Sequence, residues 1–279
     1  MNNNINNPAD TSSDHSRIKK VNVMRDEFGI DIPIENVPLP SRGLIYGEST
    51  GLHNKETIQI RPMTAREEDI LMSRAYIKNG TVLTELIKSC LVDKSIDPDI
   101  LISGDRNAVL TSLRITGYGS DYEANVECPS CGFVNKSSFD LSSLPIKRLE
   151  IEPVEIGENK FEISLPVTKK SVVVRFLNGY DEREMSLTNE RKLKQGINVE
   201  SPITDRLFKS IIEVEGITDK NKINFFVKNL PVRDSLALRR FLDKHEPGID
   251  MKVWLSCNSC HEESEVDLPM GTSFFWPDA

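Results

Sequence analysis

Two short stretches, CPSCG (residues 128–132) and CNSCH (residues 257–261), decide how this 279-residue chain is organised. A C-x-x-C turn lets two thiolates face one ion, and a glycine after the second cysteine permits the backbone geometry that turns amides toward sulfur. Four thiolates from two such turns form the ligand set of a tetrahedral structural zinc site. The sequence therefore predicts a Zn²⁺ ion held by Cys128, Cys131, Cys257 and Cys260.

The separation of the two turns is unusual for a zinc ribbon. Cys131 and Cys257 are 126 positions apart, whereas about 15–20 residues separate the pairs of a compact ribbon. An internal duplication would explain this spacing, because two similar units related by a pseudo-twofold axis would bring their terminal turns face to face. Two alternatives remain open at this stage: a zinc ion shared between chains, and turns completed by another protein.

Several segments of the chain recur in the same order. TELIKSCL (residues 84–91) aligns without gaps with DRLFKSII (205–212), and ETIQIRPM (56–63) matches KSVVVRFL (170–177) in pattern. Each copy then ends in a strand-like run and a C-x-x-C turn. The shared order predicts an α+β protein of two tandem similar units, each a β-hairpin plus helices, joined through a shared zinc-ribbon-like site of four cysteines.

The boundaries follow from composition. Residues 1–30 are predicted to be a flexible N-terminal arm, because they contain little that can be buried. This arm is either a solvated tail or a segment that orders on a partner. Residues 31–149 form the first unit, which ends after the CPSCG turn, and residues 150–279 form the second unit, which ends after the CNSCH turn.

Local patterns predict individual elements. In the first unit we expect residues 43–46 to pair with 57–60 as a hairpin, followed by a helix over 64–77 that begins with a capping box. In the second unit we expect a hairpin over 160–177, a helix whose apolar stripe reaches Ile212, and a last helix over 232–244.

Composition excludes some classes of protein. The net charge of −8 and the pI of about 5.2 argue against a protein that coats DNA, RNA or an anionic membrane. No apolar run approaches the roughly 18–20 residues of a membrane-spanning helix, and the N-terminus lacks a secretory apolar segment. We therefore expect a reducing compartment, in which cysteines are metal ligands or buried thiols rather than disulfides.

The sequence offers no catalytic motif. It contains no P-loop, nucleophile elbow, H-E-x-x-H or G-x-G-x-x-G pattern, and only four histidines. Cys90 aligns with Ile211 of the second copy, so it is predicted to be a buried apolar residue and not a nucleophile. We therefore expect no enzyme, no catalytic residues and no small-molecule substrate. A nucleic-acid-binding or regulatory zinc ribbon is the alternative function.

Three stretches carry a resemblance to a known family: VPLPSRGLIY (37–46), IRPMTAREEDIL (60–71) and GDRNAVLTSLRITGYGSDYEANVECPSCG (104–132). Together with FFWPD (274–278), they resemble the baseplate proteins of T-even-like contractile-tailed bacteriophages. The resemblance implies a structural or assembly component of the baseplate hub, with other tail and hub proteins as partners. It also implies assembly in the host cytoplasm, after which the protein either stays in the virion tail baseplate or leaves the finished particle.

The C-terminal aromatic residues allow two interpretations. Phe274, Phe275 and Trp276 either pack against their own unit or remain exposed as an anchor for a partner, since aromatic residues are enriched in interface cores.

Overall fold

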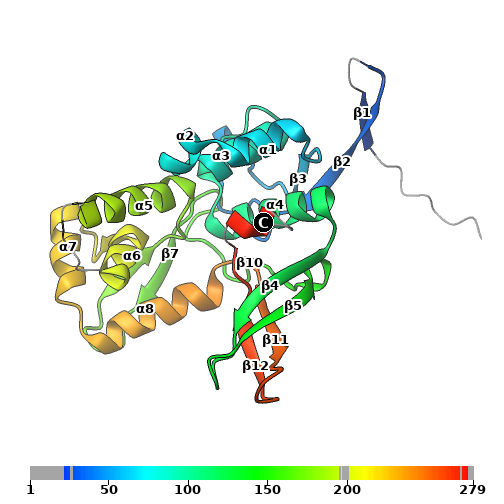
Figure 1. Cartoon of the computed structure of the whole chain (residues 1–279). Helices are drawn as coiled ribbons and strands as arrows, with labels where there is room; N and C mark the ends of the chain where they lie inside the picture. Colours follow the sequence, from blue (N-terminus) through cyan, green and yellow to red (C-terminus); the bar gives the residue numbers. More distant parts are fainter. Residues whose placement is uncertain (1–21, 26–27, 195, 197–200, 271, 276–279) are drawn as a thin grey trace, which may run out of the picture.

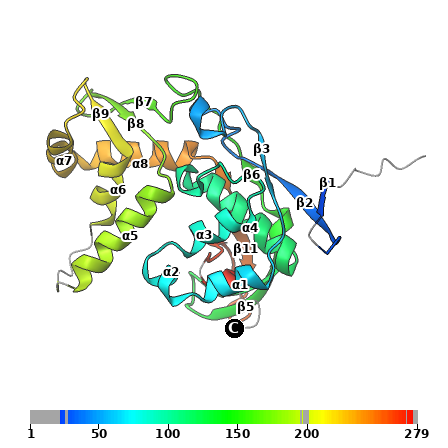
Figure 2. The same cartoon turned by 90° about the horizontal axis from the view of Figure 1, so that it is seen from above.

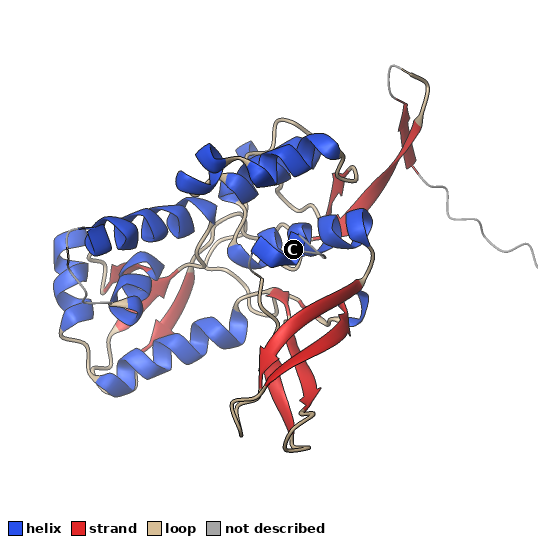
Figure 3. Cartoon of the chain, in the orientation of Figure 1, coloured by secondary structure: helices blue, strands red, loops and turns tan. Residues whose placement is uncertain are grey.

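The computed structural model describes residues 22–25, 28–194, 196, 201–270 and 272–275, and these residues form an α+β fold of helices and small antiparallel sheets (Figures 1 and 3). We call residues 22–149 the N-terminal half and residues 150–275 the C-terminal half. The N-terminal half contains β1 (Asn22–Arg25), β2 (Asp31–Pro38), β3 (Thr57–Ile60), α1 (Ala65–Met72), α2 (Arg74–Lys78), α3 (Val82–Cys90), α4 (Ser103–Tyr118), β4 (Asp121–Glu127), β5 (Val134–Asp140) and β6 (Ile146–Lys147). The C-terminal half contains β7 (Phe161–Ser164), β8 (Ser171–Val174), α5 (Gly179–Lys194), α6 (Pro202–Ser210), β9 (Ile211–Val214), α7 (Lys220–Lys228), α8 (Val232–His245), β10 (Gly248–Ile249), β11 (Lys252–Ser256) and β12 (Glu263–Asp267). The α+β class is as the sequence predicts.

Each half places a small antiparallel sheet against helices. In the C-terminal half the sheet β7–β8–β9 lies among α5, α6, α7 and α8. In the N-terminal half β3 and the end of β2 lie beside the helices, whereas β1 and the start of β2 project away from them (Figures 1 and 2). The hairpins β4–β5 and β11–β12, one from each half, lie side by side (Figure 1). One cluster of buried apolar side chains runs through both halves and includes Leu39, Leu86, Leu113, Phe161 and Leu238.

The predicted hairpin of residues 43–46 with 57–60 is wrong. Strand β3 pairs instead with β2, from Glu35 opposite Ile60 to Pro38 opposite Thr57. Residues 43–46 form a turn, in which Gly43 has a φ of 72° and a Cβ there would lie 2.4 Å from the backbone nitrogen of Lys55. From this turn the buried hydroxyl of Tyr46 donates to the carboxylate of Asp105 at 2.6 Å.

The predicted helix over 64–77 and the predicted helix reaching Ile212 both end earlier than expected. The capping box of Thr64 and Glu67 is confirmed, but the helix breaks at Ser73 into α1 and α2. Helix α6 ends at Ser210, and Ile211 opens strand β9, which pairs with Val174 of β8. Apolar residues at the end of a helical stripe can equally belong to a short buried strand that follows the helix, so the pattern alone does not show where the helix ends. The second hairpin, seen as β7 and β8, and the last helix, seen as α8, are confirmed.

An arginine directly follows β3 in the N-terminal half and β8 in the C-terminal half, and each arginine binds a carboxylate at the start of the next helix. The guanidinium of Arg61 donates to both oxygens of Glu67 at 3.1 and 2.7 Å, and that of Arg175 donates to both oxygens of Asp181 at 2.6 and 2.7 Å. The separation is six residues in both cases. Each acid is also the third residue of its helix and accepts the N–H of the residue before the helix, Thr64 or Asn178.

In each half, a fully buried aspartate near the start of a helix holds a loop that joins two paired strands, β2 and β3 in the N-terminal half and β7 and β8 in the C-terminal half. In α4, Asp105 accepts the backbone N–H of Ser41 at 2.9 Å and its hydroxyl at 2.5 Å. In α8, Asp234 accepts the backbone N–H groups of Val167 and Thr168 at 2.7 and 2.9 Å. Both aspartates are third in their helix, and both loops follow a Leu-Pro pair.

The Glu67 carboxylate makes the stability of the protein depend on acid pH. Burial raises the pKa of Glu67, but hydrogen bonds from Arg61, Ser89 and Thr64 outweigh it and lower the pKa from 4.5 to about 2. The native state therefore binds fewer protons there than the unfolded state between these values, so Glu67 contributes stability at neutral pH that is lost as the pH falls from 4.5 to about 2.

We therefore expect Glu67→Gln to unfold at lower urea concentration than the wild type at pH 7, and the difference to shrink as the pH falls. Urea titrations of both proteins between pH 7 and pH 2 measure the difference in their unfolding midpoints. Asp69→Asn, on an exposed position of the same helix, serves as the control and should track the wild type. A difference that stays constant with pH would contradict this assignment.

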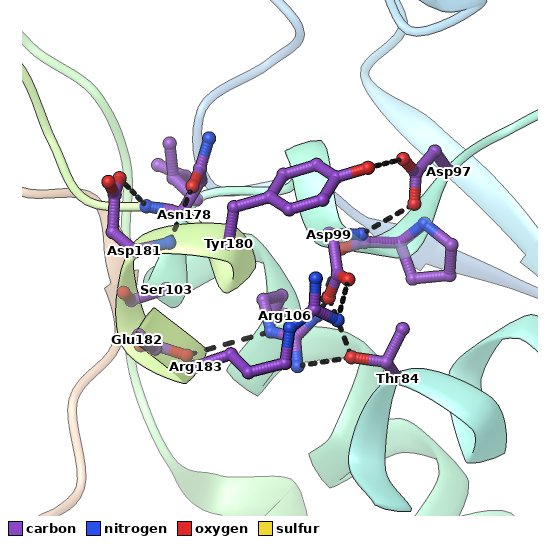
Figure 4. Close-up of polar contacts among 12 residues, drawn as sticks. Thr84, Asp97, Asp99, Ser103, Arg106, Asn178, Tyr180, Asp181, Glu182 and Arg183 are labelled. Atoms are coloured by element: carbon purple, nitrogen blue, oxygen red, sulfur yellow. Dashed lines mark hydrogen bonds and ion pairs between the residues drawn. The ribbon is translucent and has the colours of Figure 1, made fainter. Parts of the chain in front are cut away.

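A polar network crosses between the halves (Figure 4). Asp99, in a short turn before α4, accepts the hydroxyl of Thr84 at 2.6 Å and an N–H of Arg106 at 3.3 Å. From α5, Arg183 pairs with the same carboxylate, and Glu182 lies 3.7 Å from the Nε of Arg106. Buried ions with several partners are costly to leave unpaired, so the network fixes how α5 sits on the N-terminal half.

Phe274 and Phe275 are buried, and Phe274 packs against the N-terminal half. The ring of Phe274 lies 5.1 Å from that of Tyr122 in β4, and its carbonyl accepts the Nε–H of Arg114 at 2.8 Å. Of the two interpretations, burial is confirmed for these two residues, with the correction that Phe274 packs against the N-terminal half. Residues 1–21 of the predicted arm and Trp276 lie outside the described residues, while residues 22–25 form β1.

Candidate metal centre

Two hairpins present the two C-x-x-C turns at neighbouring tips. In the first turn the Cys128 N–H donates to the Phe133 carbonyl at 2.9 Å, and in the second the Cys257 N–H donates to the Glu262 carbonyl at 3.0 Å. The residue after each second cysteine has a positive φ, 73° for Gly132 and 60° for His261. The two turns therefore share one backbone geometry, and the position of glycine in one is filled by histidine in the other.

All four predicted ligands meet. Their sulfur atoms lie within 4.8 Å of one another, with 3.8 Å between Cys128 and Cys260 and 3.6 Å between Cys131 and Cys257. A tetrahedral ion with Zn–S bonds of about 2.3 Å requires sulfur–sulfur distances of about 3.8 Å. The cluster can therefore hold one metal ion with two ligands from each half, which is the arrangement that the duplication predicts.

The cluster sits at the end of an apolar contact between the hairpins. The inward residues Tyr122, Ala124 and Val126 of β4 and Leu255 of β11 are buried. Cys128 and Cys257 continue this buried row, whereas Cys131 and Cys260 are exposed. The apolar contact orients the hairpins, and a bound ion would close their open end.

Asn135 connects the two turns, and sequence reasoning missed it. This residue of β5 is fully buried, its amide oxygen accepts the N–H of Asn258 at 2.9 Å, and its Nδ2 lies 3.7 Å from the sulfur of Cys257. Groups that hydrogen-bond to a ligand orient it for the metal. The available signal was a polar residue at an inward position of β5, where the strand alternation calls for an apolar one.

Hydrogen bonds to sulfur favour the thiolate form of Cys257. The backbone amides of Cys260 and Ser259 point at the Cys257 sulfur and lower the pKa of that thiol to about 6 against the opposing effect of burial. A metal ion binds the thiolate and not the thiol, so such a group suits a ligand.

The remaining candidates do not form a second centre among the described residues. Cys90 is completely buried, as predicted, and burial raises the pKa of its thiol to about 12. His53 is half-buried, and its Nδ1 contacts the Tyr46 carbonyl at 2.7 Å. A cavity of about 880 Å³ lies between the halves, and its lining includes Lys147, Arg206 and Glu246 but neither cysteine nor histidine.

The fold and the cluster define a class: an α+β protein in which two distant C-x-x-C turns can together hold one metal ion. Comparison with models of protein families identifies the family within this class. The family model described as T4 bacteriophage base plate protein matches residues 48–276, which is most of the chain. The chain belongs to this family, as the resemblance predicted.

Other comparisons add nothing to this assignment, since no curated protein and no solved structure matches the chain. Family membership implies a virion-associated baseplate component with a structural role and contacts to other phage structural proteins. A structural family favours a non-enzyme. In the part of the chain that the structure describes, no helix has both the length and the apolar character needed to cross a membrane.

Proposed function

We propose that the protein is a structural or assembly component of the phage baseplate hub, that it acts by binding other tail and hub proteins, and that a structural zinc ion stiffens it. The observation that carries the proposal is the meeting of four thiols, two from each half of a family-matched chain, in one cluster of tetrahedral size. Assembly takes place in the host cytoplasm.

Zinc fits the ligand set better than other metals. Four sulfur ligands in a tetrahedral arrangement favour Zn²⁺ or an iron–sulfur centre, and the paired turns with amide N–H groups aimed at sulfur are typical of structural zinc. Four protein ligands leave no open position, so Cys128, Cys131, Cys257 and Cys260 would hold the ion and perform no chemistry. The ion would link the two halves.

Two tandem units, residues 31–149 and 150–279, form part of the proposal, with residues 1–30 as an arm. Support comes from the two matched contacts described above: the arginine–carboxylate pair at a six-residue spacing, and the buried aspartate that holds a Leu-Pro loop. The strand ends are similar as well: the N–H of Arg61 donates to the carbonyl of Cys90 and that of Arg175 to the carbonyl of Ser210, and these two acceptors lie one position apart in the aligned segments.

The alternative, a nucleic-acid-binding zinc ribbon, is disfavoured by charge. Carboxylates dominate the outward faces of both hairpins, and only two lysines accompany them. The exposed acids are Asp121, Glu123, Glu127 and Asp140 in the first hairpin and Glu263, Glu265 and Asp267 in the second; the lysines are Lys136 and Lys252. Such a surface repels phosphates.

Native mass spectrometry of the purified chain tests the zinc clamp. One zinc ion per monomer is expected; one ion per dimer would move the site to a subunit interface, and four free thiols without metal would remove the clamp. The hub assignment is tested separately by co-expressing the chain with each hub protein and, as a control, each tail-fibre protein of the same phage. We expect stable complexes with hub proteins only, and complexes limited to tail-fibre proteins would refute the assignment.

A further inference from the structure

The outward face of the β11–β12 hairpin combines an exposed tryptophan with acids. The Trp254 side chain is 72% exposed. It lies opposite Glu265, with Glu263 and Asp267 two residues to either side on the paired strand. The one cation on this face, Lys252, lies 3.6 Å from Glu265. We call these residues the ribbon face. An exposed aromatic side chain among carboxylates is suited to a surface that presents cations and apolar groups.

A surface of this kind exists elsewhere on the same chain. Along α7, Lys222, Phe225 and Lys228 follow one another at three-residue spacing and share one exposed side of the helix. Val232 and Arg233 open α8 directly after it and are also exposed. We call these five residues the basic corner.

The basic corner combines exposed cations with exposed apolar side chains, which is uncommon on the surface of an acidic protein. Phe225 is 71% and Val232 79% exposed, so two large apolar side chains stand in water beside three cations. The acid nearest in sequence, Asp234, is buried and already accepts two backbone N–H groups. It therefore does not neutralise the corner.

The two surfaces do not meet within one molecule. Helix α7 and the tips of the hairpins lie at separate ends of the structure (Figures 1 and 2). Because the surfaces are complementary in charge and each carries an exposed apolar anchor, we propose that the occupant of the ribbon face is the basic corner of a second copy of this chain. Trp254 would stack against Arg233 and Phe225, and the carboxylates would pair with Lys222 and Lys228.

This contact joins two different patches, so it is heterologous. Such contacts produce closed rings when the rotation between copies closes, the smallest being a two-copy ring in which both contacts form, and open chains when it does not. The inference concerns self-association. It stands apart from the zinc clamp and from hub binding.

The test uses two charge-reversed variants of the full chain. The ribbon variant carries Glu263→Lys and Glu265→Lys, and the corner variant carries Lys228→Glu and Arg233→Glu. Sedimentation velocity at low and high salt reports assembly. We expect the wild type to associate at low salt and to dissociate at high salt, because exposed charges are screened. Each variant alone should remain monomeric.

Mixing the two variants is the decisive measurement. The ribbon variant keeps its positive basic corner, which can bind the negative ribbon face that the corner variant keeps. The two reversed surfaces, a positive ribbon face and a negative corner, are also complementary to each other. The mixture should therefore regain assembly that neither variant shows alone. Trp254→Ala should weaken wild-type association about 30-fold, the loss typical of a central anchor. Glu48→Lys and Lys88→Glu, exposed charges outside both surfaces, should associate as the wild type does.

Several outcomes would overturn the inference. These are a wild type that is monomeric at every salt concentration, variants that associate as well as the wild type, and a mixture that stays monomeric. An oligonucleotide that binds the wild type and not the corner variant, without self-association, would assign the corner to nucleic acid instead. Zinc content measured on the same samples separates this result from a failure of the clamp.

Discussion

Cys128→Ser is expected to lose the bound metal and to melt about 10 °C below the wild type, which is the scale expected when a structural metal site is lost from a chain of this size. Metal binding to the native state contributes directly to its stability, because the unfolded chain has no preformed site. The loss of stability in Cys128→Ser should exceed that of a local defect, because the ligands come from both halves and the remaining three thiols no longer link the halves tightly. Differential scanning fluorimetry and native mass spectrometry measure both effects.

The matched control is Ser130→Ala, an exposed hydroxyl inside the same C-x-x-C turn that is not a ligand. It should keep one metal ion and the wild-type melting temperature. Adding a strong chelator should lower the melting temperature of the wild type and of Ser130→Ala, but should leave Cys128→Ser nearly unchanged. If Cys128→Ser melted with the wild type, the ion would play no structural role in this protein.

The site was more predictable than the fold around it. A C-x-x-C turn is a local feature, so both turns could be recognised without any knowledge of tertiary structure. Their meeting across 126 positions was inferred from the repeated order of segments, and the structure brings the four sulfurs within 4.8 Å. That the ion is zinc stays a prediction. Asn135 was missed because its role depends on a contact with the other hairpin.

Strand β2 was missed because its two prolines argue against a strand. Pro33 is tolerated because β2 pairs there with β1 alone, so that one edge of the strand is open, whereas β3 pairs only with residues 35–38. Helix α7 had no prediction either. Its exposed Phe225 blurs the amphipathic pattern on which helix prediction depends.

The buried aspartates show a different limit. Asp105 and Asp234 lie in helix starts, where an acid is expected for its effect on the helix dipole alone. Both instead hold loops more than 60 residues earlier in the chain. Burial raises the pKa of Asp105 although hydrogen bonds from Ser41 and Tyr46 lower it, so this carboxyl acts as a buried acceptor and not as a solvated charge. Only the structure gives the two aspartates these partners.

Gly104→Ala is expected to destabilise the protein by about 3 kcal/mol, at the upper end of what overpacking costs. Gly104 lies in the first turn of α4, and a Cβ there would stand 1.7 Å from the carbonyl oxygen of Pro247 and 2.9 Å from the Cα of Gly248. These are backbone atoms of the turn between α8 and β10, so no side chain can rotate away. The alanine would force α4 and this turn of the C-terminal half apart.

Gly117→Ala in the same helix is the matched control. A Cβ at Gly117 would stand 2.7 Å from the terminal methyl of Met63, which is flexible and can move aside. Alanine is the better helix former by about 1 kcal/mol at both positions, so Gly117→Ala should stay within about 1 kcal/mol of the wild type in either direction. Urea unfolding of the three proteins measures the contrast. Equal effects of the two substitutions would show that the close approach at Gly104 does not hold the halves together. If Gly104→Ala is damaging yet retains one metal ion per chain, the thiol cluster at the hairpin tips and this glycine contact connect the halves independently of each other, because the loss of one then leaves the other intact.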